Sequence, residues 1–268
     1  MADGLIIERL RADRGGAAVL REVTLRAARG EVTALLGLNG SGKTTLLLAA
    51  LGLIPASCAR CEVDGEPLLS ASPRRRAQLA AYIPQRIQVD DGLTALEVVL
   101  MGANARTPLL RGYGPAERER ALDCLARLGA RALSGRTMGS LSEGQRRLCV
   151  LARALLQSPR ALLLDEPDAA LDLPRRWEVL ASVRALALEG RAALVSLHDA
   201  ALALNACDRA LILNGGRVDR AVDLRAAGRD ELEDAMRALY GEVRLSGSPG
   251  QWHVSPAGGA LHRPAHPV

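Results

Sequence analysis

The chain has 268 residues, of which 49% are hydrophobic and only 2% are aromatic, with no Phe. Its net charge of +5 is mild for this length, and the scarcity of aromatic side chains argues against a surface that stacks nucleic-acid bases. No apolar run reaches the roughly 18 residues of a membrane span and no signal peptide is recognised, so we expect a cytosolic protein that meets a membrane only through a partner.

The cysteines and the one basic run point to no special chemistry. Five cysteines are an odd number without the spacing of a disulfide framework, and Cys58 and Cys61 form a lone C-x-x-C, which we expect to be a plain turn. Arg74, Arg75 and Arg76 are the only three consecutive basic residues. We expect them in a solvated turn or on a helix face rather than in a nucleic-acid-binding patch.

The chain begins with strands that lead into a glycine-rich loop. Short strands are predicted over residues 5–10 and 23–25, and residues 32–36 are a β-branched and apolar run typical of a buried strand. The loop follows at residues 37–44 with the sequence GLNGSGKT, and a helix is predicted over residues 44–53. Strand, loop and helix in this order are the context that a phosphate-binding loop requires.

Lys43 is the only lysine among the 35 basic residues of the chain. A compact ammonium fits inside a loop that wraps around a triphosphate, whereas the planar guanidinium of Arg is wide. Glycines let the backbone N–H groups turn inward, and the following helix adds the positive end of its dipole. We therefore expect Lys43 to reach the β- and γ-phosphates of a nucleotide and Thr44 to hold Mg²⁺.

The middle of the chain is predicted to be helical. A strand over residues 80–83 stops at Pro84 and Gln85, and the following segments have apolar residues at helical spacing. Pro115 suits the first turn of one of these helices. The predicted helices cover residues 94–101, 115–128 and 143–157.

Alternating strands and helices return in the last part. Residues 161–164 are a continuous apolar run, which is typical of a central parallel strand. Asp230 is predicted to cap the last helix, and residues 245–268, which include His253, His262 and His266, are predicted to be a partly disordered tail. The other predicted strands cover residues 192–197, 210–213 and 217–222, and the predicted helices cover residues 173–188 and 230–239.

Two further groups of residues narrow the chemistry. Asp165 and Glu166 end the apolar strand; the first suits Mg²⁺, and the second could activate water as a general base. Ser142 precedes the helix predicted over residues 143–157, and the first amides of that helix offer a second anion site. One ATP does not need two phosphate sites in one chain unless two chains share it.

Six motifs in this order resemble those of the ATP-binding cassette (ABC) family, from residue 5 to about residue 240. The resemblance implies an α/β fold: a phosphate-loop NTPase core with a mixed, largely parallel sheet, an antiparallel β subdomain and an inserted all-helical subdomain. The ABC domain would cover residues 1–244, with the helical insert at about residues 86–157. The motifs are the loop at Gly37, Gln85, the LSEGQ signature at residues 141–145, Asp165 with Glu166, Ala170 to Asp172, and His198.

In that family two cassettes pair head to tail and enclose two ATP molecules, so the resemblance implies a role for each motif residue. Glu166, His198 and Gln85 would be catalytic, and Thr44, Gln85 and Asp165 would hold Mg²⁺. Gln85 would also contact the transport subunit. The residues implied in ATP binding are Arg14, Gly37, Asn39, Gly40, Ser41, Gly42, Lys43, Thr44 and Thr45 and, across the dimer, Ser142, Gly144, Gln145 and Asp172.

Two positions depart from the family pattern. Arg14 stands where an aromatic residue usually stacks on adenine; its guanidinium could stack in the same way or could face solvent. Glu143 stands in the signature where Gly is most common, and a carboxylate near a phosphate site is unfavourable unless it points away. These departures affect the expected turnover rate and not the fold.

The segments around residues 82–86, 93–102, 171–173 and 239–244 resemble the ATPases of iron–siderophore, haem and cobalamin importers. That resemblance implies a homodimer bound to integral-membrane permease subunits at the cytoplasmic face of the cell membrane, served indirectly by a substrate-binding protein and without a nucleic-acid partner. Three alternatives stay open: the ATPase of another importer or of an exporter, a soluble cassette ATPase of translation or DNA maintenance, and a regulatory cassette with weak activity.

Overall fold

A computed structural model of the chain describes residues 3–106, 112–169 and 171–257. Its centre is a six-stranded sheet in the order β10-β9-β3-β8-β7-β6, parallel except for the edge pair β9 and β10. Strands β3, β7 and β8 are buried along their whole length, because helices or the second sheet cover both faces. The strands are β3 (Val32–Leu36), β6 (Ala80–Ile83), β7 (Ala161–Asp165), β8 (Ala192–Leu197), β9 (Arg209–Asn214) and β10 (Arg217–Asp223).

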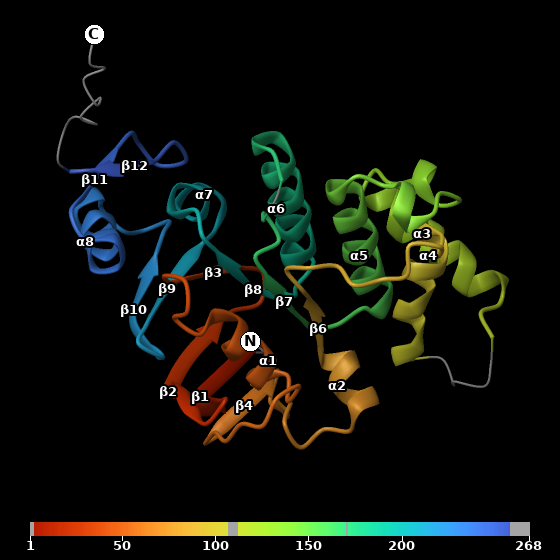
Figure 1. Cartoon of the computed structure of the whole chain (residues 1–268), viewed down its shortest axis with the longest axis horizontal. Helices are drawn as coiled ribbons and strands as arrows, with labels where there is room; N and C mark the ends of the chain where they lie inside the picture. Colours follow the sequence, from red (N-terminus) through yellow and green to blue (C-terminus); the bar gives the residue numbers. More distant parts are fainter. Residues whose placement is uncertain (1–2, 107–111, 170, 258–268) are drawn as a thin grey trace, which may run out of the picture.

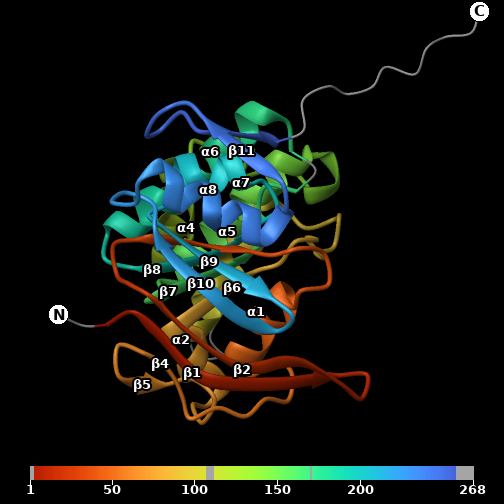
Figure 2. The ribbon, with the colours of Figure 1, turned by 90° about the vertical axis from the view of Figure 1, so that its left-hand side faces the viewer.

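A second, antiparallel sheet lies below the first, and α1 lies between the two (Figure 2). Its order is β2-β1-β4-β5. The first two strands are longer than predicted and form a hairpin closed by Gly15 and Gly16, both at positive φ, as a tight turn requires. The elements are β1 (Leu5–Arg14), β2 (Ala17–Ala27), α1 (Lys43–Ala50), β4 (Arg60–Val63) and β5 (Glu66–Pro67).

The helical insert packs at one end of the central sheet (Figure 1). Thr94 caps the first helix of the insert through a capping box. The Thr94 hydroxyl accepts a hydrogen bond from the Glu97 N–H, and the Glu97 carboxylate accepts one from the Thr94 N–H. Pro115 occupies the first turn of α4, as predicted. No helix in the described part of the chain is long and apolar enough to span a bilayer. The insert contains α3 (Ala95–Leu100), α4 (Pro115–Arg127), α5 (Glu143–Gln157) and the 3₁₀ turns Met101–Ala105, Arg131–Leu133 and Met138–Ser140.

Three of the remaining helices, α6, α7 and α8, pack on the face of the central sheet opposite α1, whereas α2 packs through Leu79 into the core on the α1 side. The run of three arginines lies on the helix α2, which is one of the two placements expected: Arg74 is exposed, Arg74 and Arg76 donate to backbone carbonyls, and Arg75 pairs with Glu66. Two features of the other helices were not predicted correctly. The helix α7 was not predicted, and Gly228 rather than Asp230 is the N-cap of α8. These helices are α2 (Pro73–Leu79), α6 (Leu173–Leu188), α7 (Ala200–Ala206) and α8 (Arg229–Tyr240).

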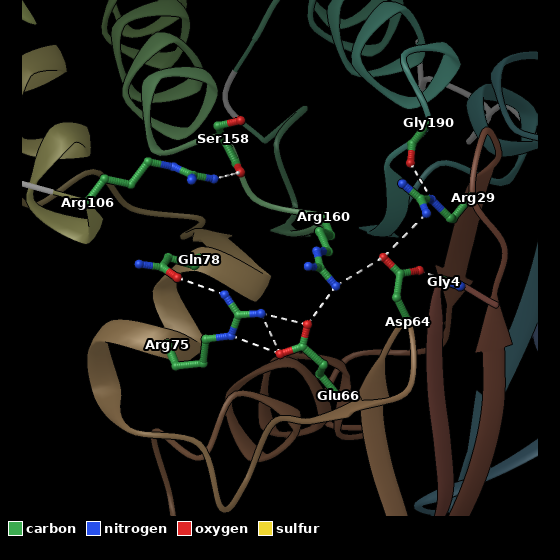
Figure 3. A network of polar contacts seen from close by, with 10 residues as sticks. All are labelled: Gly4, Arg29, Asp64, Glu66, Arg75, Gln78, Arg106, Ser158, Arg160 and Gly190. Carbon is green, nitrogen blue, oxygen red and sulfur yellow. Dashed lines mark hydrogen bonds and ion pairs between the residues drawn. The ribbon is translucent and has the colours of Figure 1, made fainter. Parts of the chain in front are cut away.

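A polar network joins the antiparallel sheet and α2 to the central sheet (Figure 3). Asp64 accepts from the Gly4 N–H at 3.2 Å and pairs with Arg29 at 3.5 Å. Glu66 pairs with Arg160, just before β7, at 2.8 Å. Arginine guanidinium groups and carboxylates from four separate segments therefore link the two sheets that enclose α1.

The C-terminal segment differs from the predicted tail, because part of it forms a β-hairpin. Residues 243–257 contain a hairpin of β11 (Val243–Ser246) and β12 (His253–Pro256), so the predicted boundary at residue 245 falls inside a strand. The hairpin is ordered because its Trp252 packs into the main core with only 6% exposed, and Asn205 of α7 exchanges two hydrogen bonds with the Trp252 backbone at 2.7 and 2.8 Å. His262 and His266 lie outside the described residues.

Trp252→Ala is expected to lower the free energy of unfolding by about 3 kcal/mol, because it removes a large buried side chain and leaves a cavity. Trp177, which is 40% exposed, provides the matched control: Trp177→Ala should cost less than about 1 kcal/mol. Urea denaturation of both variants is the measurement. Equal stabilities for the two would mean that residues 245–257 are the loose tail that the sequence predicted.

Candidate functional site

The glycine-rich loop between β3 and α1 has the conformation that a phosphate-binding loop needs. Gly40 and Gly42 adopt φ of 78° and 105°, which residues with a side chain rarely adopt. At Gly37 an added Cβ would come within 2.6 Å of the Leu213 carbonyl oxygen and 2.4 Å of Ser41 Oγ, so only glycine fits there. The loop is thus shaped by its glycines, and its backbone remains free to bind a ligand.

Lys43 projects back under this loop. Its Nζ donates to the Gly37 carbonyl at 2.8 Å, lies 3.9 Å from Glu166 Oε1, and the side chain is only 5% exposed. Burial lowers the pKa of Lys43, while the carboxylates of Glu166 and Asp165 oppose that shift. A buried ammonium whose hydrogen-bond partners include carbonyls of its own loop is suited to exchange them for phosphate oxygens.

Glu166 lies at the centre of the site. It follows β7 in the left-handed region at φ 45°, a strained conformation for a non-glycine residue that aims its carboxylate into the cavity beside the loop. Its Oε1 is 2.5 Å from His198 Nε2, and its Oε2 accepts from the Gln85 amide. Three residues that the sequence assigned to catalysis therefore meet, although they come from three segments of the chain.

Asp165, the last residue of β7, is held by two residues that the sequence reasoning missed. Ser196 of β8 donates from Oγ to Asp165 Oδ1 at 2.8 Å and accepts from the Glu166 N–H at 2.8 Å. Tyr82 of β6 donates to Asp165 Oδ2 at 3.2 Å, and burial raises the pKa of the Tyr82 hydroxyl. Both residues lie near the ends of strands that flank β7, which is the signal that could have identified them.

One cavity of about 520 Å³ collects most of the predicted site. Arg14, at the tip of the first hairpin, also lines it, which leaves its guanidinium available to a bound base. Val19, which faces the same cavity from β2, was not predicted. The full lining is Arg14, Val19, Asn39, Gly40, Ser41, Gly42, Lys43, Thr44, Thr45, Gln85, Glu166 and His198.

The signature residues do not line this cavity. Ser142 caps α5 through a capping box with Gln145, and Asp172 caps α6 by accepting from the Arg175 N–H at 3.1 Å. The Glu143 carboxylate pairs with Arg147 of the same helix at 3.5 Å, so its negative charge is directed toward a cation. Ala170 lies outside the described residues. Within one chain, the structure therefore separates the two predicted phosphate sites.

Arg147, which was also not predicted, connects the signature helix to the segment of Gln85. Its guanidinium is 1% exposed and donates to the carbonyls of Pro84 at 2.9 Å and of Gln85 at 3.0 Å. A buried arginine fork that bridges two backbone carbonyls is a rigid link. The start of α5 and the Gln85 backbone are therefore held as one unit.

The donors at the site fit a nucleotide with Mg²⁺. The glycine loop leaves backbone amides for phosphates, and the buried Ser41 Oγ has no hydrogen-bond partner among the described residues. Thr44, Gln85 and Asp165 supply hydroxyl, amide and carboxylate oxygens, which are the hard ligands that Mg²⁺ prefers. The cavity thus combines a triphosphate cradle with the side-chain oxygens of Thr44 and Gln85, while Asp165, which is 2% exposed, does not line it.

Comparison with known proteins agrees with this geometry. The family model described as ABC transporter matches residues 20–169. A hemin import ATP-binding protein of Nocardia farcinica (strain IFM 10152) is 40% identical over 81% of this chain and 75% of its own length, and one of Myxococcus xanthus (strain DK1622) is 36% identical over 88% and 91%. A dimeric ATP-binding cassette solved with ADP and Pi has a TM-score of 0.72 and 26% identity, over 83% of this chain and 100% of that chain.

Fold and site together define a nucleotide-binding α/β protein of the phosphate-loop class, with a mixed, largely parallel core sheet, an antiparallel sheet and a helical insert. The chain belongs to the ABC transporter family, in which it is an ATP-binding and ATP-hydrolysing cassette. The resemblance inferred from the motifs is therefore confirmed at the level of family and fold.

Proposed function

We propose that this cassette powers the import of hemin through a separate membrane permease. The assignment of hemin as the cargo is supported by the similarity to relatives named as hemin import ATP-binding proteins, at 36–40% identity over most of both chains. Iron–siderophore and cobalamin import share the sequence features but have no such support. Because the cavity around Lys43 is suited to a nucleotide, cargo recognition is assigned in this proposal to the permease and the substrate-binding protein.

Two copies of the chain pair head to tail around two ATP molecules. Ser142, Gly144, Gln145 and Asp172 lie outside the cavity that contains Lys43, so they are available to the nucleotide of a second copy. The dimeric cassette solved with ADP and Pi supports a dimer of cassettes. Each chain then contributes its phosphate loop to one ATP and its signature to the other.

Glu166 is the general base of hydrolysis in this proposal. Lys43 and the loop amides hold the β- and γ-phosphates, and Arg14 lies against the base. Thr44, Gln85 and Asp165 hold Mg²⁺, which when bound neutralises phosphate charge. His198, now at Glu166, turns toward the γ-phosphate and frees the carboxylate to accept a proton from water.

Bound to its permease, the cassette would lie at the cytoplasmic face of the cell membrane. The permease subunits would contact the segment around Gln85, which Arg147 links to the signature helix. A substrate-binding protein on the other side of the permease would deliver the cargo. Closure and reopening of the cassette pair would thereby drive the permease between its two states.

A growth assay tests the cargo. Deletion of the gene in its host should abolish growth with hemin as the sole iron source and leave growth with a ferric salt unchanged. The intact gene should restore growth on hemin, and a Glu166→Gln allele should not. Normal growth of the deletion strain on hemin, together with loss of siderophore or cobalamin use, would assign the cassette to another importer.

A further inference from the structure

His198 lies between two hollows of the molecule. One is the nucleotide cavity, and the other is a groove of about 440 Å³ between α7 and the C-terminal hairpin, lined by His198, Asp199, Tyr240, Val243 and Val254 among others. The His198 side chain is 44% exposed, so packing alone does not fix it. Its position must depend on hydrogen bonds to its ring and to its backbone.

Tyr240 supplies such a bond. Its hydroxyl donates to the His198 backbone carbonyl at 3.0 Å, across 42 positions of sequence. Burial and the nearby Asp199 carboxylate raise the pKa of the Tyr240 hydroxyl, so it keeps its proton and remains a donor.

The groups around Tyr240 hold it in place. Tyr240 ends α8, which buries Leu232, Ala235, Met236 and Leu239, and the next turn enters the hairpin of β11 and β12. That hairpin bonds to α7 through Asn205 and Trp252, and α7 begins two residues after His198. Figure 1 shows α7 beside α8 and the hairpin. The segment that follows β8 is thus held at both its start and its far end.

We infer that Tyr240 is a positioning residue for ATP hydrolysis, acting through the main chain of His198. The inference rests on the role proposed above for His198. When His198 turns from Glu166 to the γ-phosphate, its ring would rotate on a backbone that the Tyr240 hydroxyl holds through the His198 carbonyl. Tyr240 itself does not line the nucleotide cavity.

Tyr240→Phe tests the inference because it removes only the hydroxyl. We expect kcat to fall roughly five-fold, the effect of losing one ordinary hydrogen bond, with KM for ATP within about two-fold of the parent. Tyr113→Phe is the matched control: it removes a hydroxyl that donates to Asn104 Oδ1 at 2.8 Å in the helical insert. That variant should hydrolyse ATP like the parent, and thermal unfolding should find both variants folded.

Tyr240→Phe in a His198→Ala background tests whether Tyr240 affects hydrolysis through His198. Single-turnover hydrolysis by His198→Ala should not fall further when Tyr240→Phe is added. An equal further fall would overturn the inference, because Tyr240 would then act elsewhere, and so would parental activity of Tyr240→Phe. If His198→Ala itself hydrolyses ATP like the parent, the proposed role of His198 fails first and the role of Tyr240 with it.

Discussion

Glu166→Gln is expected to lower steady-state ATP hydrolysis at least about 100-fold and to leave ATP binding intact. The amide cannot accept a proton from water, yet it has nearly the shape of the carboxylate between His198 and Gln85. ATP should therefore remain between two chains. Light scattering should show a monomer without ATP and a dimer with it.

Two controls define that result. Glu189→Gln changes an exposed carboxylate paired with Arg191 and should leave hydrolysis unchanged. Ser142→Arg, added to Glu166→Gln, places a long charged side chain at the signature and should prevent the ATP-dependent dimer without preventing ATP binding. Hydrolysis at the parental rate by Glu166→Gln would refute its role as base, and normal dimerisation of the double variant would refute the shared site.

Lys43→Arg is expected to weaken ATP binding about 100-fold although it conserves the charge. The Lys43 ammonium is buried beneath the loop, 2.8 Å from the Gly37 carbonyl, and Gly37 has no free space around it. A guanidinium is too wide for this position, so the charge-assisted bonds to phosphate, worth about 3 kcal/mol together, would be lost.

Calorimetric titration with ATP in the Glu166→Gln background measures this loss without turnover. Arg127→Lys offers the reverse exchange at an exposed ion pair with Glu189 and should bind ATP like its parent. An affinity within two-fold of the parent for Lys43→Arg would mean that charge alone matters at this position. The rarity of lysine in the chain would then have no bearing on the loop.

The parts of the fold predicted well are those with strong local patterns. The bounds of α5, α6 and β8 agree with the prediction, since each has a long apolar stripe or run. The helix α7 was missed because it has only seven residues, which are too few to show a helical spacing of apolar residues, although its Ala and Leu are strong helix formers. The C-terminal hairpin was missed because its strands are short and polar, and Trp252 and Asn205, which hold it, are far apart in sequence.

The residues of the candidate site likewise fall into those that were predicted from local sequence and those that were missed. Lys43 stands out within the phosphate-binding loop and Asp165 and Glu166 at the end of an apolar strand, whereas His198 was assigned only through the order of motifs in the family resemblance. Ser196, Tyr82 and Arg147 were missed because their roles depend on which strands pair and on where the Gln85 segment meets α5. The direction of the Glu143 side chain also needed the structure, which pairs it with Arg147, whereas Asp172 could be predicted as a helix cap from the Leu-Pro that follows it.

The burial of the only lysine has a consequence for chemical modification. Acylating and other amine-directed reagents find a single side-chain target in these 268 residues, and it lies in the nucleotide cavity. Any acyl group on Lys43 would occupy the space of a phosphate, so side-chain acylation and nucleotide occupancy exclude each other. The rest of the surface carries its positive charge on arginine and does not react. For this cassette, lysine acylation would therefore act as an all-or-none block of the ATPase.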